Sequence, residues 1–255
     1  MDVADLREFY GTRLGMATRR LIARKILGHW ASPARGTLMG LGYATPYLEA
    51  LGKSAERTLA FMPGQRGVMQ WPADGPVSSA LIDECELPLV ESAVDHALII
   101  HGLELTEDPA EMLREVWRVL APQGRLLIAV PNRRGMWARF DSTPFGYGQP
   151  FSRPQMAKLL KETQFSPVGW SQALFMPPFE RSFALASAPA FERVGSYVSP
   201  AFSGVVIVEA VKQVYAMPRG KRARRLLPRL KPALAPRLNP SYEGHDLLDN
   251  LPHHD

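Results

Sequence analysis

Two spacings of apolar residues alternate along the chain. Residues 5–30 place apolar side chains three or four positions apart with cations on the opposite side, which predicts one or two amphipathic helices. Shorter apolar runs further along end in glycine or proline, as strands do. The expected strands are residues 36–40, 57–62, 80–83, 92–101, 125–130, 168–175 and 204–215. The other expected helices are residues 46–52, the segment from its cap Thr106 to Leu120, and residues 155–163.

This alternation favours an open α/β sheet. Residues 92–101 are apolar almost throughout, which is typical of a central parallel strand covered on both faces. A turn at residues 122–124 is expected to lead into the strand of residues 125–130. The last two strands, residues 168–175 and 204–215, are expected to pair and close the sheet.

The positive charge is concentrated near the C-terminus. The net charge is +5 overall, but Pro218–Pro240 holds eight Lys and Arg residues and no acid. Prolines recur through this segment and few large apolar side chains interrupt it, so it favours a flexible tail. We therefore expect one domain over residues 1–217 and a disordered basic tail over 218–255. Residues 218–240 are expected to be solvated, or to attract a polyanion or an acidic protein.

Several classes of protein are disfavoured. The composition, 46% hydrophobic and 22% charged, is that of a globular protein. No apolar run has the length of a transmembrane segment, and the first ten residues carry acids where a secretory signal is hydrophobic. Cys85 is the only cysteine, and no Cys/His spacing suits zinc, so neither a disulfide nor a metal site is expected. A cytoplasmic protein without a metal is the expectation.

One glycine turn follows the first expected strand, at Gly40-Leu41-Gly42-Tyr43-Ala44-Thr45. Ligands of open α/β sheets bind where strands end and the chain turns into a helix. A dinucleotide fingerprint, however, has a third glycine where Thr45 stands and an acid some 20 residues later, where residues 61–63 are Phe-Met-Pro. Nicotinamide binding is therefore disfavoured.

The second half of the sheet carries a longer ordered series of motifs: Leu87-Pro88-Leu89, Ser92–Asp95, Leu113–Glu115 and Arg118–Leu126. This series resembles the class I S-adenosylmethionine-dependent methyltransferases, in particular the type 11-like branch that acts on small molecules and lipids. The resemblance covers residues 36–131 well and 150–215 loosely. It implies a doubly wound, mostly parallel, seven-stranded Rossmann-like sheet. Within the domain, the N-terminal helices would be residues 1–30, the cofactor-binding half 36–131, and the substrate loop and closing strands 132–217.

The resemblance also implies a cofactor, S-adenosylmethionine, and residues that bind it. Gly40, Gly42 and Ala44 take the places of the glycine loop beside the methionine part of the cofactor. Asp83 stands where an acid commonly meets the adenine amino group, and His101 ends the fourth strand at the methyl-transfer face. Two usual acids are replaced: Leu38 stands two residues before the first glycine, and Met62 stands where an acid grips the ribose.

Candidate bases and substrate contacts follow the fifth strand. His101, Asp141 and Tyr147 are the candidate bases for an acceptor that must lose a proton. Arg133 and Arg134 are candidates for holding an anionic substrate, and Phe145 and Tyr147 for lining an apolar pocket. Ordinary roles compete with these: a buried histidine bonded to backbone, a solvated basic turn, and routine loop packing.

Two functions remain open from the sequence. The first is an S-adenosylmethionine-dependent methyltransferase with a small-molecule or lipid-like acceptor, which the glycine turn and Asp83 favour. The second is a catalytically degenerate protein of the same fold that serves as a binding or regulatory subunit of a partner protein. The replacements at Leu38 and Met62 favour the second.

Overall fold

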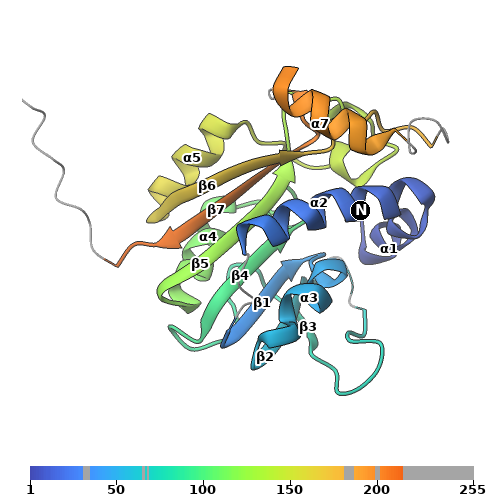
Figure 1. Ribbon diagram of the computed structural model, residues 1–255. Coiled ribbons are helices and arrows are strands. Elements are labelled where there is room, and N and C mark those ends of the chain that lie inside the picture. The colour runs from blue at the N-terminus through green and yellow to red at the C-terminus, as the bar shows by residue number, and fades with distance from the viewer. Residues whose placement is uncertain (31–34, 65–66, 68, 181–186, 199–201, 215–255) are drawn as a thin grey trace, which may run out of the picture. The chain divides into compact units, whose positions relative to one another are not determined.

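A seven-stranded sheet forms the centre of the protein (Figure 1). The computed structural model describes residues 1–30, 35–64, 67, 69–180, 187–198 and 202–214. Residues Met1–Tyr215 make up one unit. The expected tail, residues 218–255, lies outside the described residues, so its boundary and its disorder stay predictions.

The strand order is β3-β2-β1-β4-β5-β7-β6. The strands are β1 (Thr37–Gly42), β2 (Arg57–Pro63), β3 (Ser79–Ile82), β4 (Val94–Ile100), β5 (Leu120–Pro131), β6 (Phe165–Ala173) and β7 (Val205–Lys212). The first five strands pair in parallel, and β7 runs antiparallel to both β5 and β6. The doubly wound, mostly parallel sheet and its closing strand pair are thus confirmed.

Helices cover both faces of the sheet (Figure 1). The helices are α1 (Val3–Gly11), α2 (Arg13–His29), α3 (Thr45–Leu51), α4 (Pro109–Val119), α5 (Arg153–Glu162) and α7 (Ala188–Val198). The described connections also contain short 3-10 helices, η1 (Gly52–Ser54), η3 (Trp137–Arg139) and η4 (Pro144–Gly146). Because side chains alternate along a strand, Leu98 and Ile100 pack in one core with α2 and α3, while Ala97 and Ile99 pack in the other with α4 and α5.

The structure corrects three details of the expected elements. Asp108, not Thr106, caps α4: its side chain accepts hydrogen bonds from the backbone of Ala110 and Glu111. Pro109 at the first helical position explains this, since the residue before a proline avoids helical geometry. The expected turn at residues 122–124 lies inside β5, and α7 was not predicted.

Candidate functional site

A chain of buried polar side chains lies where β4 ends. His101 follows directly on β4 with a positive φ of 49° and is buried. Its Nε2 lies 2.8 Å from the hydroxyl of Tyr10, and its Nδ1 lies 3.2 Å from Oε1 of Glu104. The Tyr10 hydroxyl also lies 3.2 Å from the hydroxyl of Tyr47. The arrangement joins α1, the edge of the sheet and α3.

Burial sets the protonation state of Tyr10 in this hydrogen-bonded group. Burial raises the pKa of Tyr10 well above its usual value, with Tyr47 adding to the effect, so Tyr10 stays a neutral phenol. A carboxylate at Nδ1 favours the tautomer in which that nitrogen carries the proton, which leaves Nε2 to accept from Tyr10. The second oxygen of Glu104, Oε2, is buried without a hydrogen-bond partner among the described residues. His101 therefore has the orientation that a general base requires.

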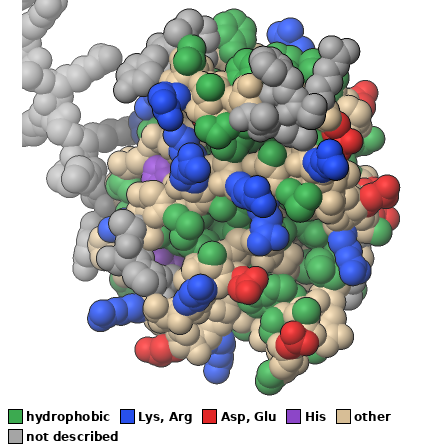
Figure 2. Space-filling model, turned by 45° about the vertical axis from the view of Figure 1, so that its right-hand side comes forward, with side chains coloured by type: hydrophobic (Ala, Val, Ile, Leu, Met, Phe, Trp, Pro, Cys, Tyr) green, Lys and Arg blue, Asp and Glu red, His purple; other side chains and the backbone are tan. Residues whose placement is uncertain are grey.

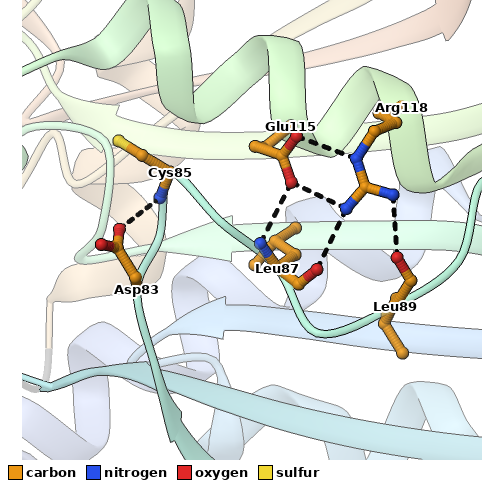
Figure 3. Close-up of polar contacts among 6 residues, drawn as sticks. All are labelled: Asp83, Cys85, Leu87, Leu89, Glu115 and Arg118. Atoms are coloured by element: carbon orange, nitrogen blue, oxygen red, sulfur yellow. Dashed lines mark hydrogen bonds and ion pairs between the residues drawn. The ribbon is translucent and has the colours of Figure 1, made fainter.

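A cavity of about 620 Å³ lies at the carboxyl edge of β2 and β3. Asp83 stands in its lining together with Gly64, just after β2, and the segment Leu105–Asp108. Among the lining residues that the structure describes, every charged one is acidic: Asp83, Glu84, Glu107 and Asp108. Oδ1 of Asp83 accepts a hydrogen bond of 2.8 Å from the backbone of Cys85, which fixes the turn (Figure 3). The cavity offers carboxylate acceptors to a ligand that carries N–H or O–H donors.

An ion pair on α4 holds the loop that follows this turn (Figure 3). Arg118 donates to the carbonyl oxygens of Leu87 and Leu89, and Glu115 accepts from the backbone N–H of Leu87. The hydrogen bond from Arg118 lowers the pKa of Glu115. These residues belong to the motif series that carries the family resemblance, and here they position the backbone that borders the cavity.

The two glycines of the first turn are required by packing inside the protein. A Cβ on Gly40 would lie 2.7 Å from Leu48, and one on Gly42 would lie 2.4 Å from the carbonyl oxygen of Ile100. Gly42 also has a φ of 84°, and the N–H of Tyr43 donates to the same carbonyl at 2.7 Å. Ala44 is buried beside Gly40. Contact of Gly40, Gly42 and Ala44 with a cofactor remains a prediction.

The expected ribose position is apolar. Met62 is completely buried in a cluster with Val3, Leu6, Tyr10 and Tyr43. Its sulfur accepts a hydrogen bond of 3.4 Å from the backbone of Met69. Leu38 is likewise completely buried. The residues present therefore fit S-adenosylmethionine in part. The carboxylates of the cavity suit the adenine end, but Met62 occupies the position where a carboxylate usually binds the ribose.

The remaining predicted residues fall into separate groups. Asp141 and Tyr147 line a cavity of about 320 Å³ against α1, together with Asp5, Glu8 and Phe9. Phe145 is buried, with its ring 4.9 Å from the His101 ring. Arg133 and Arg134 are exposed in the turn after β5.

Tyr10 and Glu104 were missed by the sequence reasoning. Glu104 had a signal, since it follows His101 by three residues. Tyr10 had none, because its contact with His101 spans 91 residues. Within the part of the chain that the structure describes, no group of His, Cys, Asp and Glu could hold a metal ion.

Comparisons with known proteins agree with this fold. Residues 39–128 match the family described as a methyltransferase domain. The uncharacterized protein MJ1123 of Methanocaldococcus jannaschii is 25% identical over 150 residues, covering 55% of this chain and 69% of that protein. The resemblance to class I S-adenosylmethionine-dependent methyltransferases is thus confirmed.

Two solved structures share the architecture. One comes from the complex between the Haloferax volcanii Trm112 methyltransferase activator and a proposed methyltransferase. It superposes with a TM-score of 0.60 at 17% sequence identity, and the match covers 83% of this chain and 99% of that one. The other is the Streptomyces coelicolor geranyl diphosphate C-methyltransferase with Mg²⁺, geranyl diphosphate and S-adenosyl-L-homocysteine bound. It superposes with a TM-score of 0.52 at 16% sequence identity, and the match covers 75% of this chain and 77% of that one. At these identities the likeness is one of fold.

Proposed function

We propose that this chain is an S-adenosylmethionine-dependent methyltransferase that binds the adenosine part of its cofactor in the cavity beside Asp83. The observation that carries the proposal is the position of this cavity, at the carboxyl ends of β2 and β3, with Asp83 in its lining. Open α/β sheets bind their ligands at this edge. The Asp83 carboxylate would accept from the adenine amino group, and the Glu115–Arg118 pair would keep the neighbouring loop in place.

Methyl transfer asks little of the protein beyond position. Bound S-adenosylmethionine supplies a methyl group on a positively charged sulfur that is a good leaving group. The chain would contribute proximity and alignment, and a base where the acceptor is a hydroxyl group. We assign that base to His101, positioned by Glu104, because its Nε2 already holds a phenol hydroxyl at 2.8 Å. Tyr10 covers this nitrogen, so α1 has to shift before an acceptor reaches it.

The acceptor is proposed to be a small molecule or a lipid-like compound. The Streptomyces coelicolor neighbour binds geranyl diphosphate, an isoprenoid of this kind, which supports the class. The cavity formed by α1, Asp141 and Tyr147 combines carboxylates with aromatic rings. It is the candidate entrance for the acceptor, while Arg133 and Arg134 stay candidates for an anionic group.

Calorimetric titration of the full chain with S-adenosylhomocysteine tests the proposal. Because Met62 cannot bond the ribose, we expect a dissociation constant of tens of micromolar or weaker, roughly −6 kcal/mol. Asp83→Asn should weaken binding by roughly tenfold or more, as one charged hydrogen bond contributes about 1.5–3 kcal/mol. Glu86→Gln, at an exposed position three residues later and outside the described cavity lining, is the matched control for lost negative charge. A folded wild-type chain that binds nothing at millimolar ligand contradicts the proposal.

A second function has its own supporting observation. The buried cluster of Met62 with Tyr10 and Tyr43 places an apolar core at the ribose position, as expected of a degenerate methyltransferase fold that serves as a binding subunit. The Haloferax volcanii neighbour is found in a complex with a protein activator, which supports a protein partner. Absent S-adenosylhomocysteine binding together with capture of a stoichiometric protein partner would favour this function.

A further inference from the structure

The outward face of α2 is rich in cations. Between Gly11 and Trp30 the sequence has five Lys or Arg residues and no acid. They are Arg13, Arg19, Arg20, Arg24 and Lys25. All four arginines are exposed, and none of the five cations forms an ion pair within 4 Å with a described residue. The helix therefore presents positive charge that no close ion pair neutralises, although Glu192 on α7, whose pKa is raised by burial, lies near enough to Lys25 and Arg24 for their charges to oppose that shift.

Apolar side chains run between these arginines. Met16, Ala23 and Leu27 are seven and four residues apart, so they share one side of the helix. Met16 and Leu27 are 44% and 43% exposed. By helical spacing, Arg19 flanks this stripe on one side, and Arg20 and Arg24 flank it on the other. We call these six residues, Met16, Arg19, Arg20, Ala23, Arg24 and Leu27, the outer α2 face.

The outer α2 face is held rigidly, since the opposite side of the helix is core. Leu14, Leu21, Ile22 and Ile26 are buried against the sheet. No helix among the described residues is long and apolar enough to cross a membrane. An amphipathic helix of this kind, with cations around an exposed apolar stripe, is suited to lie in a membrane interface.

Neighbouring surface has the same character. Lys and Arg side chains gather across the middle of the face in Figure 2, with apolar side chains among them. The helix α7 exposes Val194 and Phe191, at 59% and 36%. The acids nearest in sequence to α2 are Asp2, the N-terminal cap of α1, and Asp5 and Glu8 on α1, all outside the outer α2 face.

We propose that the outer α2 face docks on an anionic lipid membrane surface. The arginines would contact lipid headgroups while Met16 and Leu27 enter the boundary between headgroups and acyl chains. A single-stranded nucleic acid fits less well, because α2 has no Phe, Tyr or Trp on which bases would stack, and its His29 ring is bonded to Ser171 and Glu209. The inference is independent of methyl transfer, and its test needs no cofactor.

The test is co-sedimentation of the full chain with phosphatidylglycerol-containing vesicles and with pure phosphatidylcholine vesicles. We expect binding to the first and little to the second. The combined variant Arg19→Gln, Arg20→Gln and Arg24→Gln should weaken binding roughly a hundredfold, since each cation near an anionic surface contributes about one kcal/mol. The matched control is Arg114→Gln, Lys158→Gln and Lys161→Gln, which removes the same charge from exposed positions on α4 and α5. Both variants keep the basic C-terminal segment.

Three results would overturn the proposal. Equal weakening by the two charge variants would mean that only net charge attracts vesicles. Unchanged binding by the α2 variant would place the contact elsewhere, with residues 218–240 next to be tested. The pair Met16→Ser and Leu27→Ser should weaken vesicle binding several-fold. If this pair binds vesicles as the wild type does, while the chain binds single-stranded RNA more tightly than vesicles, the face is a nucleic-acid surface instead.

Discussion

The hydroxyl of Tyr10, on the first helix, lies 2.8 Å from Nε2 of His101, at the end of the central strand β4. This contact connects the N-terminal helix to the edge of the sheet where ligands of this architecture bind. Because Tyr10 occupies Nε2, another group can bond this nitrogen of His101 only after α1 has moved.

Loss of the Tyr10 hydroxyl should destabilise the protein. Tyr10→Phe keeps the ring but leaves the buried Nε2 of His101 without its donor, so we expect a loss of about 1–3 kcal/mol in the free energy of unfolding. Urea denaturation measures this. Tyr43→Phe is the matched control, since the Tyr43 ring stacks on Tyr10 while its hydroxyl bonds no described residue. An equal loss in both variants would show that the hydrogen bond contributes nothing specific.

Side chains at the glycine turn should affect folding directly. Gly42→Ala adds a Cβ that would lie 2.4 Å from the Ile100 carbonyl oxygen at a φ of 84°, and we expect a loss of at least about 2 kcal/mol. Gly28→Ala in α2 meets nothing within 4 Å and should instead stabilise by roughly 0.5–1 kcal/mol. Thermal melts of the two variants should therefore shift in opposite directions. A Gly42→Ala protein as stable as the wild type would contradict the packing role.

The Arg118 clamp should be specific to a guanidinium. Arg118→Lys cannot reach the Glu115 carboxylate and the carbonyls of Leu87 and Leu89 at once, so we expect a loss of about 1–3 kcal/mol. Arg114→Lys, whose exposed pair with Glu111 lies on the same helix, should change stability by less than about 0.5 kcal/mol. Chemical denaturation compares them, and indistinguishable variants would rule out the clamp.

Acid should destabilise the protein partly through His96. Burial lowers the pKa of His96 below its usual 6.5, and its ring packs edge-on against Trp30 at 5.2 Å. Below pH 6.5 the unfolded chain therefore binds a proton that the folded chain does not, and stability falls as the pH falls. His96→Phe keeps the ring and removes the titration, so its stability relative to the wild type should rise between pH 8 and pH 5. A pH-independent difference between the two proteins would contradict this assignment.

Much of the fold was predictable from local sequence. The periods of the apolar residues located α1 and α2, the strands and most helices, because alternation along a strand and the helical repeat reflect which side chains face a core. The cap of α4 at Asp108 was misplaced, since Thr106 offers the same chemistry two residues earlier and Pro109 decides between them. The helix α7 was missed, and its Pro189, Gly195 and two valines give it a low intrinsic helix propensity.

For the candidate site, the sequence and the tertiary structure each determined a different set of features. The sequence by itself determined the family motifs, the sheet edge and Asp83, because these follow from runs of residues close together in the chain. Only the tertiary structure decided that Tyr10 bonds His101, that Met62 packs with α1, and that Gly40 and Gly42 serve the contacts of β1 with α3 and β4. The physical reason is sequence separation: side-chain hydrogen bonds and packing form between residues that a one-dimensional pattern keeps far apart, and folding alone brings them within contact distance.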